Sequence, residues 1–481
     1  MVRPRRPISI GRFAIGQNAF VAITNINALG DSQTANTVKN DGILHFNFDE
    51  SGLFAKPIDG DGGISKSGAS ILTLSGNLTY EGNTVVSGGS LIADLRNGNN
   101  LFLANDGTAF QIRSRNLELD ILDGKGQVLF DGNGYSLSVE RSYFADGEMR
   151  NLDQLTVGQF LTVGDVQAKN IVLRNGATLT LTPNHFITLE NGASFGEDSV
   201  FGVSINDSGL PLVKIGDTAQ WSVHPTATLD IQGYRQQPTV LFETSGDAFA
   251  NSDLFQLITV AGQAISETLT EDQFIDAMNV TINPDNQNQI IATSGFLVWY
   301  NGVTPGTENY DAHGTFKVDS FFWLDEQLNN NESGMGAVFG WDGKTLKKTG
   351  AGRLVLTAAN TYTGGTRIEN GIIAMMNADA VGTGEIVINA GAGLDVAYAG
   401  VLANNFSGSG TLNLQNDIVV ASGNPGFAGQ VNIANGVTTA AQIHSLGNNI
   451  TTTLEENTLL LYNVNESGSV ANSIDGNGAI H

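Results

Sequence analysis

Cysteine is absent from all 481 residues, which excludes a disulfide framework, cysteine-containing zinc sites and thiol catalysis. Proline is also scarce, at 10 residues. Charged residues make up only 15% of the chain, below the roughly 25% of an average soluble domain. No apolar run approaches the roughly 18 residues that a membrane-spanning helix needs, so we expect no such helix.

Basic residues are few: 23 Lys and Arg stand against 48 Asp and Glu, giving a net charge of −25. After the first dozen residues no basic patch occurs, so we predict no nucleic-acid partner and no docking on an anionic membrane. Met1–Pro7 is similar to the basic start of a signal peptide, but polar residues interrupt the apolar stretch after it. We therefore expect the chain to be a piece of a longer exported protein.

Glycine is abundant, at 59 residues, and hydrophobic residues reach 41%, enough for a core. Short segments such as 117–122 and 177–181 alternate apolar and polar residues and adjoin Asp-Gly or Asn-Gly turns. This rhythm continues over most of the chain without a linker, whereas a β-sandwich closes after about 100 residues. The sequence therefore predicts an all-β fold, a single right-handed parallel β-helix.

Two regions depart from this rhythm. Residues 262–280 allow a short amphipathic helix, with Thr270 as its cap, and we interpret it as an excursion from the β-helix. Aromatic residues gather between Phe296 and Trp341. We expect them to thicken the core or to cap one face, and a carbohydrate-stacking surface is the alternative.

Segments 66–91 and 348–373 align without a gap. The matched pairs are Lys66 with Lys348, Gly68 with Gly350, Leu72 with Leu354, Leu74 with Leu356, Tyr80 with Tyr362, Gly82 with Gly364, Thr84 with Thr366 and Gly89 with Gly371. Leu-x-Leu places two apolar side chains on one face of a strand, and glycine allows tight corners. We expect the tyrosine ring to be buried at a corner, where its hydroxyl can stay in contact with water.

This unit resembles the passenger-associated transport repeat of bacterial autotransporters. The resemblance implies structural roles in the second copy for Lys348, Gly350, Gly352, Leu354, Leu356, Asn360, Tyr362, Gly364, Thr366 and Gly371. The first copy departs from the pattern, because Ser70 replaces the second glycine and Asn77 lies one place early. A weaker variant occurs at 408–436, where Phe427 stands at the aromatic corner, and another begins at Ile474.

The resemblance implies a passenger segment displayed at the cell surface of a Gram-negative bacterium, or secreted from it. We divide the chain into an N-terminal β-helix region (1–65), a passenger body (66–339) and a transport-repeat region (340–481) that aids folding-coupled export. The implied partner is the protein's own outer-membrane β-barrel translocator, which we expect outside this chain. A structural stalk with an adhesive, virulence-type surface for a host protein or glycan is the expected role.

Enzymatic chemistry finds little support in the sequence, and we predict no catalytic residues, no cofactor and no metal. Ser32 lies in a Gly-Asp-Ser context, but no histidine follows an aspartate at the spacing that a serine hydrolase of this kind needs. Asp59-Gly-Asp61 and Asp131-Gly-Asn133 have only part of a calcium-loop spacing. The alternative is a polysaccharide-acting lyase or glycosidase, whose carboxylates would cluster in one groove.

Overall fold

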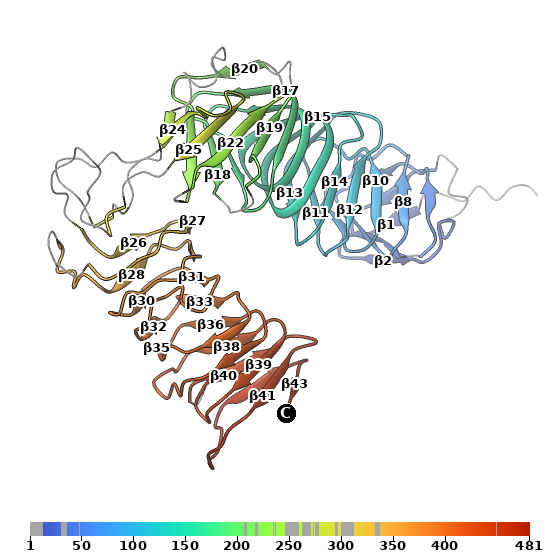
Figure 1. Ribbon diagram of the computed structural model, residues 1–481. Coiled ribbons are helices and arrows are strands. Elements are labelled where there is room, and N and C mark those ends of the chain that lie inside the picture. Colours follow the sequence, from blue (N-terminus) through green and yellow to red (C-terminus); the bar gives the residue numbers. More distant parts are fainter. Residues whose placement is uncertain are drawn as a thin grey trace, which may run out of the picture.

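The computed structural model is a parallel β-solenoid of about 20 turns (Figure 1). It describes residues 13–29, 36–47, 49–205, 209–216, 220–233, 235, 237–245, 259–261, 271–272, 274, 279–293, 297–299, 312–331, 337–448 and 450–481. Within these residues the secondary structure consists of strands and turns, with no helix. Accordingly, no helix in the described part is long and apolar enough to cross a membrane.

The N-terminal stack comprises the strands β1 to β25. Their bounds are β1 (Phe13–Ile15), β2 (Phe20–Ile23), β3 (Val38–Asn40), β4 (Ile43–Asn47), β5 (Gly52–Phe54), β6 (Ile58–Asp59), β7 (Gly63–Ser67), β8 (Ile71–Leu74), β9 (Thr84–Val86), β10 (Ser90–Ala93), β11 (Asn99–Leu103), β12 (Ala109–Ile112), β13 (Leu117–Gly124), β14 (Leu129–Asp131), β15 (Leu137–Leu173), β16 (Thr178–Leu181), β17 (Ile187–Phe195), β18 (Val200–Ser204), β19 (Val213–Ile215), β20 (Gln220–Val223), β21 (Thr228–Gln232), β22 (Thr239–Thr244), β23 (Thr259–Ala261), β24 (Asn279–Ile282) and β25 (Gln289–Thr293). β1, β3 and β6 form a small sheet, and the other strands join one continuous sheet because long strands such as β15 run through the corners.

The C-terminal stack comprises the strands β26 to β43, arranged in three parallel sheets. The first sheet holds β26 (Thr315–Lys317), β28 (Leu346–Thr349), β30 (Thr366–Ile368), β32 (Ile386–Ile388) and β35 (Phe406–Gly408). The second holds β27 (Phe321–Leu324), β29 (Arg353–Leu356), β31 (Ile372–Met375), β33 (Gly393–Val396), β36 (Thr411–Leu414), β38 (Gln430–Ile433), β40 (Thr451–Leu454) and β42 (Ser473–Gly476). The third holds β34 (Gly400–Leu402), β37 (Ile418–Val420), β39 (Val437–Ala440), β41 (Leu459–Tyr462) and β43 (Ala479–Ile480).

Alternation along each strand positions the core. In β36 the residues Leu412 and Leu414 are buried, and they pair in register with Val431 and Ile433 of β38. Because these parallel rungs stack without a register shift, side chains at equivalent positions lie above one another. The same face of the strands therefore stays apolar from rung to rung. One continuous hydrophobic core runs from Ile15 to Leu460.

The expected parallel β-helix is confirmed. Most of the helix expected at 262–280 lies outside the described residues; where that span is described, Glu271 and Asp272 form a turn and Asn279 begins β24. Within the described part of the aromatic cluster, Trp299 and Phe316 belong to the core, as expected: both are fully buried, with ring centroids 6.2 Å apart. Phe339, by contrast, is 51% exposed.

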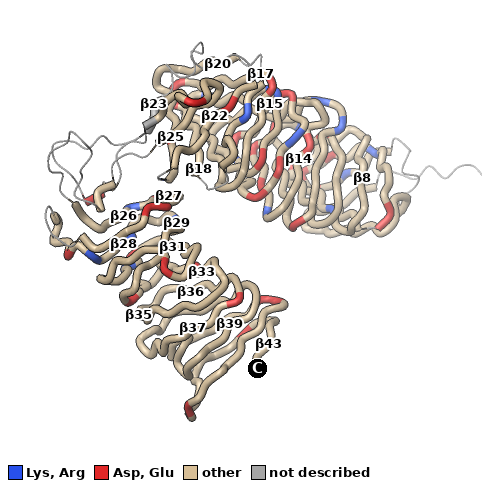
Figure 2. The backbone as a smooth tube through the Cα atoms, in the orientation of Figure 1, with Lys and Arg blue, Asp and Glu red and all other residues tan. Residues whose placement is uncertain are grey.

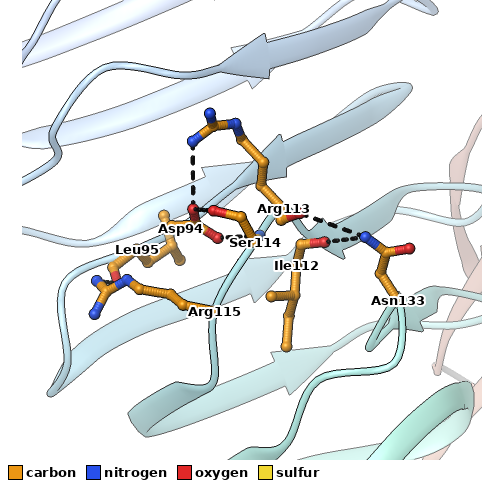
Figure 3. Close-up of polar contacts among 7 residues, drawn as sticks. All are labelled: Asp94, Leu95, Ile112, Arg113, Ser114, Arg115 and Asn133. Carbon is orange, nitrogen blue, oxygen red and sulfur yellow. Dashed lines mark hydrogen bonds and ion pairs between the residues drawn. The ribbon is translucent and has the colours of Figure 1, made fainter.

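Side-chain carboxylates and amides at the corners join successive turns. The acceptor oxygen receives the backbone N–H of a residue about one rung later, as in Asp123 with Tyr143 at 3.0 Å and Asp417 with Val437 at 2.8 Å. Figure 3 shows such a corner, where Asp94 accepts the Ser114 backbone N–H at 2.7 Å and the Ser114 hydroxyl at 2.5 Å. These carboxylates therefore serve the turns, since each pairs a backbone donor that the sheet leaves free.

We predict that Asp94→Ala loosens this corner, because the Ser114 N–H loses its acceptor and charge-assisted hydrogen bonds contribute about 1.5–3 kcal/mol each. Hydrogen exchange at the Ser114 amide should accelerate at least several-fold, as expected for local opening. Asp120→Ala is the matched control, because Asp120 is exposed and makes no described hydrogen bond. Unchanged exchange at Ser114 would contradict the capping role.

Candidate functional site

The two aligned segments form corners of the same construction. Lys66, at 1% exposure, donates from Nζ to the carbonyls of Gly68 and Gly88, both at 2.7 Å. Lys348, at 0% exposure, donates to the carbonyls of Gly350 at 2.8 Å and Asn370 at 3.2 Å. In both cases the lysine donates to two carbonyls of its own turn and to one of the following rung, so it joins two rungs. Lys348 also lies 3.3 Å from the Val318 carbonyl of the preceding rung.

Burial has a cost for each of these ammonium groups. Burial lowers the pKa of Lys348 to about 8, and the negative charge of nearby Asp319 offsets only part of this effect. It also lowers the pKa of Lys66, which Asp49 opposes. The carbonyl acceptors compensate for the lost water, because a buried cation without partners would be strongly destabilising.

The tyrosines of the two copies are fully buried, and their hydroxyls are buried with them. The Tyr80 hydroxyl pairs with Thr84 Oγ1 at 2.5 Å, and the Tyr362 hydroxyl pairs with Thr366 Oγ1 at 2.6 Å. The expectation of a hydroxyl in water is therefore wrong: the threonine four residues later replaces the solvent. Burial correspondingly raises the pKa of Tyr362.

Glycines make the close approach of the rungs possible. Gly350 and Gly371 have φ values of 76° and 68°, which disfavour any side chain. A Cβ on Gly352 would lie 2.2 Å from the Ser320 carbonyl oxygen, and one on Gly364 would lie 2.4 Å from Thr345 Oγ1. These close contacts give each glycine of the second copy a steric reason.

Asn360 connects the rungs on either side of it. Its Oδ1 accepts the Leu328 backbone N–H at 2.7 Å, and its Nδ2 donates to the Ala380 carbonyl at 2.5 Å. In the first copy, buried Leu78 occupies the place that aligns with Asn360. Leu354 and Leu356, the remaining residues of the predicted set, are buried on the inner face of β29.

The sequence did not reveal a polar hollow on one side of the N-terminal stack, which we call the lateral groove. It consists of two hollows of about 630 and 300 Å³, and both are lined by Glu190. Its other polar residues include Asn133, Asn151, Asp153, Gln167, Lys169, Thr188, Asn191, Lys214, Glu243, Thr244 and Ser245. These positions are spread over more than 100 residues, and only the rung register brings them together.

The candidate metal loops have structural roles where the structure describes them. Asp131 accepts the Asn133 backbone N–H at 2.8 Å, and Asp61 donates its backbone N–H to Asp41 at 3.2 Å. Over the described ranges no group of three His, Asp or Glu side chains converges in a way that could hold a metal ion. Ser32 lies outside the described residues.

We predict that Lys348→Met lowers the free energy of unfolding at pH 7 by about 1–3 kcal/mol, because buried carbonyls lose their donor. The wild-type advantage should grow as the pH rises from about 8 to the ordinary lysine pKa of 10.5. Within this window the unfolded chain binds more protons than the folded one, so stability increases with pH.

Urea unfolding followed by tryptophan fluorescence measures this effect, since Trp299, Trp323 and Trp341 lie around the second copy. Lys344→Met, at an exposed position, is the control and should change stability little. A wild-type advantage that shrinks above pH 8 would contradict the assignment.

We also predict coupling between Tyr362 and Thr366. Tyr362→Phe and Thr366→Val should each cost about 1 kcal/mol, because each leaves a buried partner unpaired. The double variant should cost less than the sum of the two, since the first change already removes the shared hydrogen bond. The same fluorescence-monitored unfolding gives the cycle, and strictly additive costs would show that the hydroxyls act independently.

Comparison with known proteins supports the same two segments. The passenger-associated transport repeat family matches residues 64–93 and 346–375, which contain both lysine–tyrosine–threonine corners. A search of curated proteins finds no match. The chain therefore carries two passenger-associated transport repeats on one parallel β-solenoid, a combination consistent with an autotransporter passenger.

Proposed function

We propose that this chain is the surface-displayed or secreted passenger segment of an autotransporter, and that its second repeat aids folding-coupled export. The observation that carries the proposal is the shared corner in the two repeats, where a buried lysine and a buried tyrosine–threonine pair join neighbouring rungs. Such a corner stabilises a rung against its neighbour, as stepwise growth of a solenoid requires. The repeats suggest a structural role.

The proposed division of labour follows the chain. Residues 340–481 form the transport-repeat region, 66–339 the passenger body and 1–65 its N-terminal region. A C-terminal rung that has folded outside the cell exposes a strand edge on which the rung before it can form, because each repeat packs only on its neighbours. Folding from this end would bias passage outward through a separate translocator. The polar lateral groove of the N-terminal stack supports an adhesive role towards a host protein or glycan.

Export tests this proposal. In the full protein with its own translocator, Tyr362→Asp and Gly364→Val should strongly reduce folded, protease-resistant passenger at the surface. Tyr362→Asp buries a carboxylate in a fully buried site, and the valine Cβ would meet Thr345 Oγ1 and the Lys344 carbonyl oxygen at 2.4 and 2.5 Å.

Gly426→Val is the matched control, because a Cβ there meets only Ser407 Cβ, at an ordinary 3.5 Å. Surface protease resistance and antibody labelling of intact cells measure the amount of passenger. Wild-type levels of folded passenger for Tyr362→Asp and Gly364→Val would refute an export role for the repeat.

A further inference from the structure

The lateral groove follows the solenoid axis across successive rungs. Its floor includes Gln167 of β15, Thr188 of β17, Lys214 of β19 and Glu243 of β22, which pair in register in that order. Their neighbours in each strand point into the core, so these four side chains face outward. Three rung spacings of about 4.8 Å make this column about 14 Å long, and the turns with Asn133 and Asn151 extend the groove further.

One end of the groove is held in place by a buried carboxylate. Asp131, at 8% exposure, accepts the Asn133 backbone N–H at 2.8 Å and the Asn151 Nδ2 at 3.1 Å, and its other oxygen pairs with Arg150 at 3.4 Å. Asn133 also donates to the Ile112 carbonyl, as Figure 3 shows. Both groove asparagines have φ near 50°, so their backbones are fixed by the turn. A ligand would therefore meet amides that are already ordered, which reduces the entropy cost of binding.

Charges of both signs are interleaved in the groove. Asp153, Glu190 and Glu243 supply carboxylates, and Lys169 and Lys214 supply ammonium groups. Figure 2 shows acidic and basic positions close together between β15 and β22. Lys169 pairs with Asp153 at 3.0 Å, whereas in the described part of the chain Glu190 and Lys214 form no ion pair. The groove thus presents donors and acceptors at short intervals without a net positive field.

This chemistry discriminates between classes of linear ligand. A nucleic acid or sulfated polysaccharide needs a basic channel, which three carboxylates against two lysines do not provide. A peptide is bound at a free strand edge or in apolar pockets, but the groove floor is the outer face of hydrogen-bonded strands and is mostly polar. A chain of neutral sugars offers hydroxyls that both donate and accept, and these match a row of amides, carboxylates and ammonium groups.

We propose that the lateral groove binds a neutral polysaccharide chain that lies parallel to the solenoid axis. The inference rests on the proposed surface display for its setting and deepens it by naming the ligand class and the place where it binds. Glu190, at the junction of the two hollows, and Lys214, in the column, are the groups placed to bind the sugar hydroxyls. Regular rungs present equivalent positions one after another, which suits a ligand that is itself a polymer.

Binding is measured on the purified chain by titration calorimetry with three neutral probes: hexasaccharides of β1,4-linked glucose, β1,4-linked N-acetylglucosamine and α1,4-linked glucose. At least one should bind, and Glu190→Gln combined with Lys214→Gln should weaken it about tenfold, as expected for the loss of charge-assisted hydrogen bonds. Glu118→Gln combined with Lys125→Gln, at exposed positions away from the groove, should leave affinity unchanged.

Circular dichroism establishes that both double variants are folded. Heparin and an extended decapeptide serve as the anionic and peptide arms. No binding of any neutral hexasaccharide, binding of heparin or peptide alone, or equal affinity in the groove variant would overturn the proposal. Because the assay needs no translocation, a negative result here leaves the export experiment free to succeed, and failed export leaves binding intact.

Discussion

Parallel, in-register hydrogen bonding between successive rungs is the constraint on which the rest of this molecule depends. Because every rung must repeat the path of the one before it, each side chain is placed directly above a counterpart about 20 residues away, as with Leu412 and Val431. A core then forms as columns of like residues. The corners are energetically demanding, because the backbone leaves the sheet there and its N–H and C=O groups need other hydrogen-bond partners.

The chain meets this need in two ways. Several corners use a surface carboxylate or amide, such as Asp417, whose desolvation cost is small because the side chain stays near water. The two transport repeats use a buried lysine and a buried tyrosine–threonine pair, which are rigid but depend on complete hydrogen bonding. The transport-repeat corners therefore join particular rungs through buried side chains, whereas the acidic corners join rungs through exposed side chains. One such corner lies in each stack, at Lys66 and at Lys348, and there it helps to define the register between neighbouring rungs.

The sequence was informative where a pattern is local. Alternation and Asn-Gly turns were enough for the parallel β-helix, and the gap-free alignment found the corners at Lys66 and Lys348. It could not show that the Tyr362 hydroxyl is enclosed, because that depends on the rung on the other side, where the Val381 carbonyl accepts from Thr366 at 3.1 Å. The sequence could not predict the lateral groove either. Asn133 and Glu243 come to lie on the same surface only when several turns of unequal length are stacked.

Among the described ladders, antiparallel pairing occurs only where β25 joins β22 and β24. β22 pairs with β19 on one side, and on its other side the next parallel rung is replaced by this reversed hairpin. A reversed strand presents a different hydrogen-bond pattern from a parallel rung, so it ends the parallel ladder that runs through β19 and β22, whereas the neighbouring ladder continues in parallel from β21 to β23. The hairpin thus covers a strand edge that would otherwise be open to pairing with strands of other molecules, which is a route to aggregation.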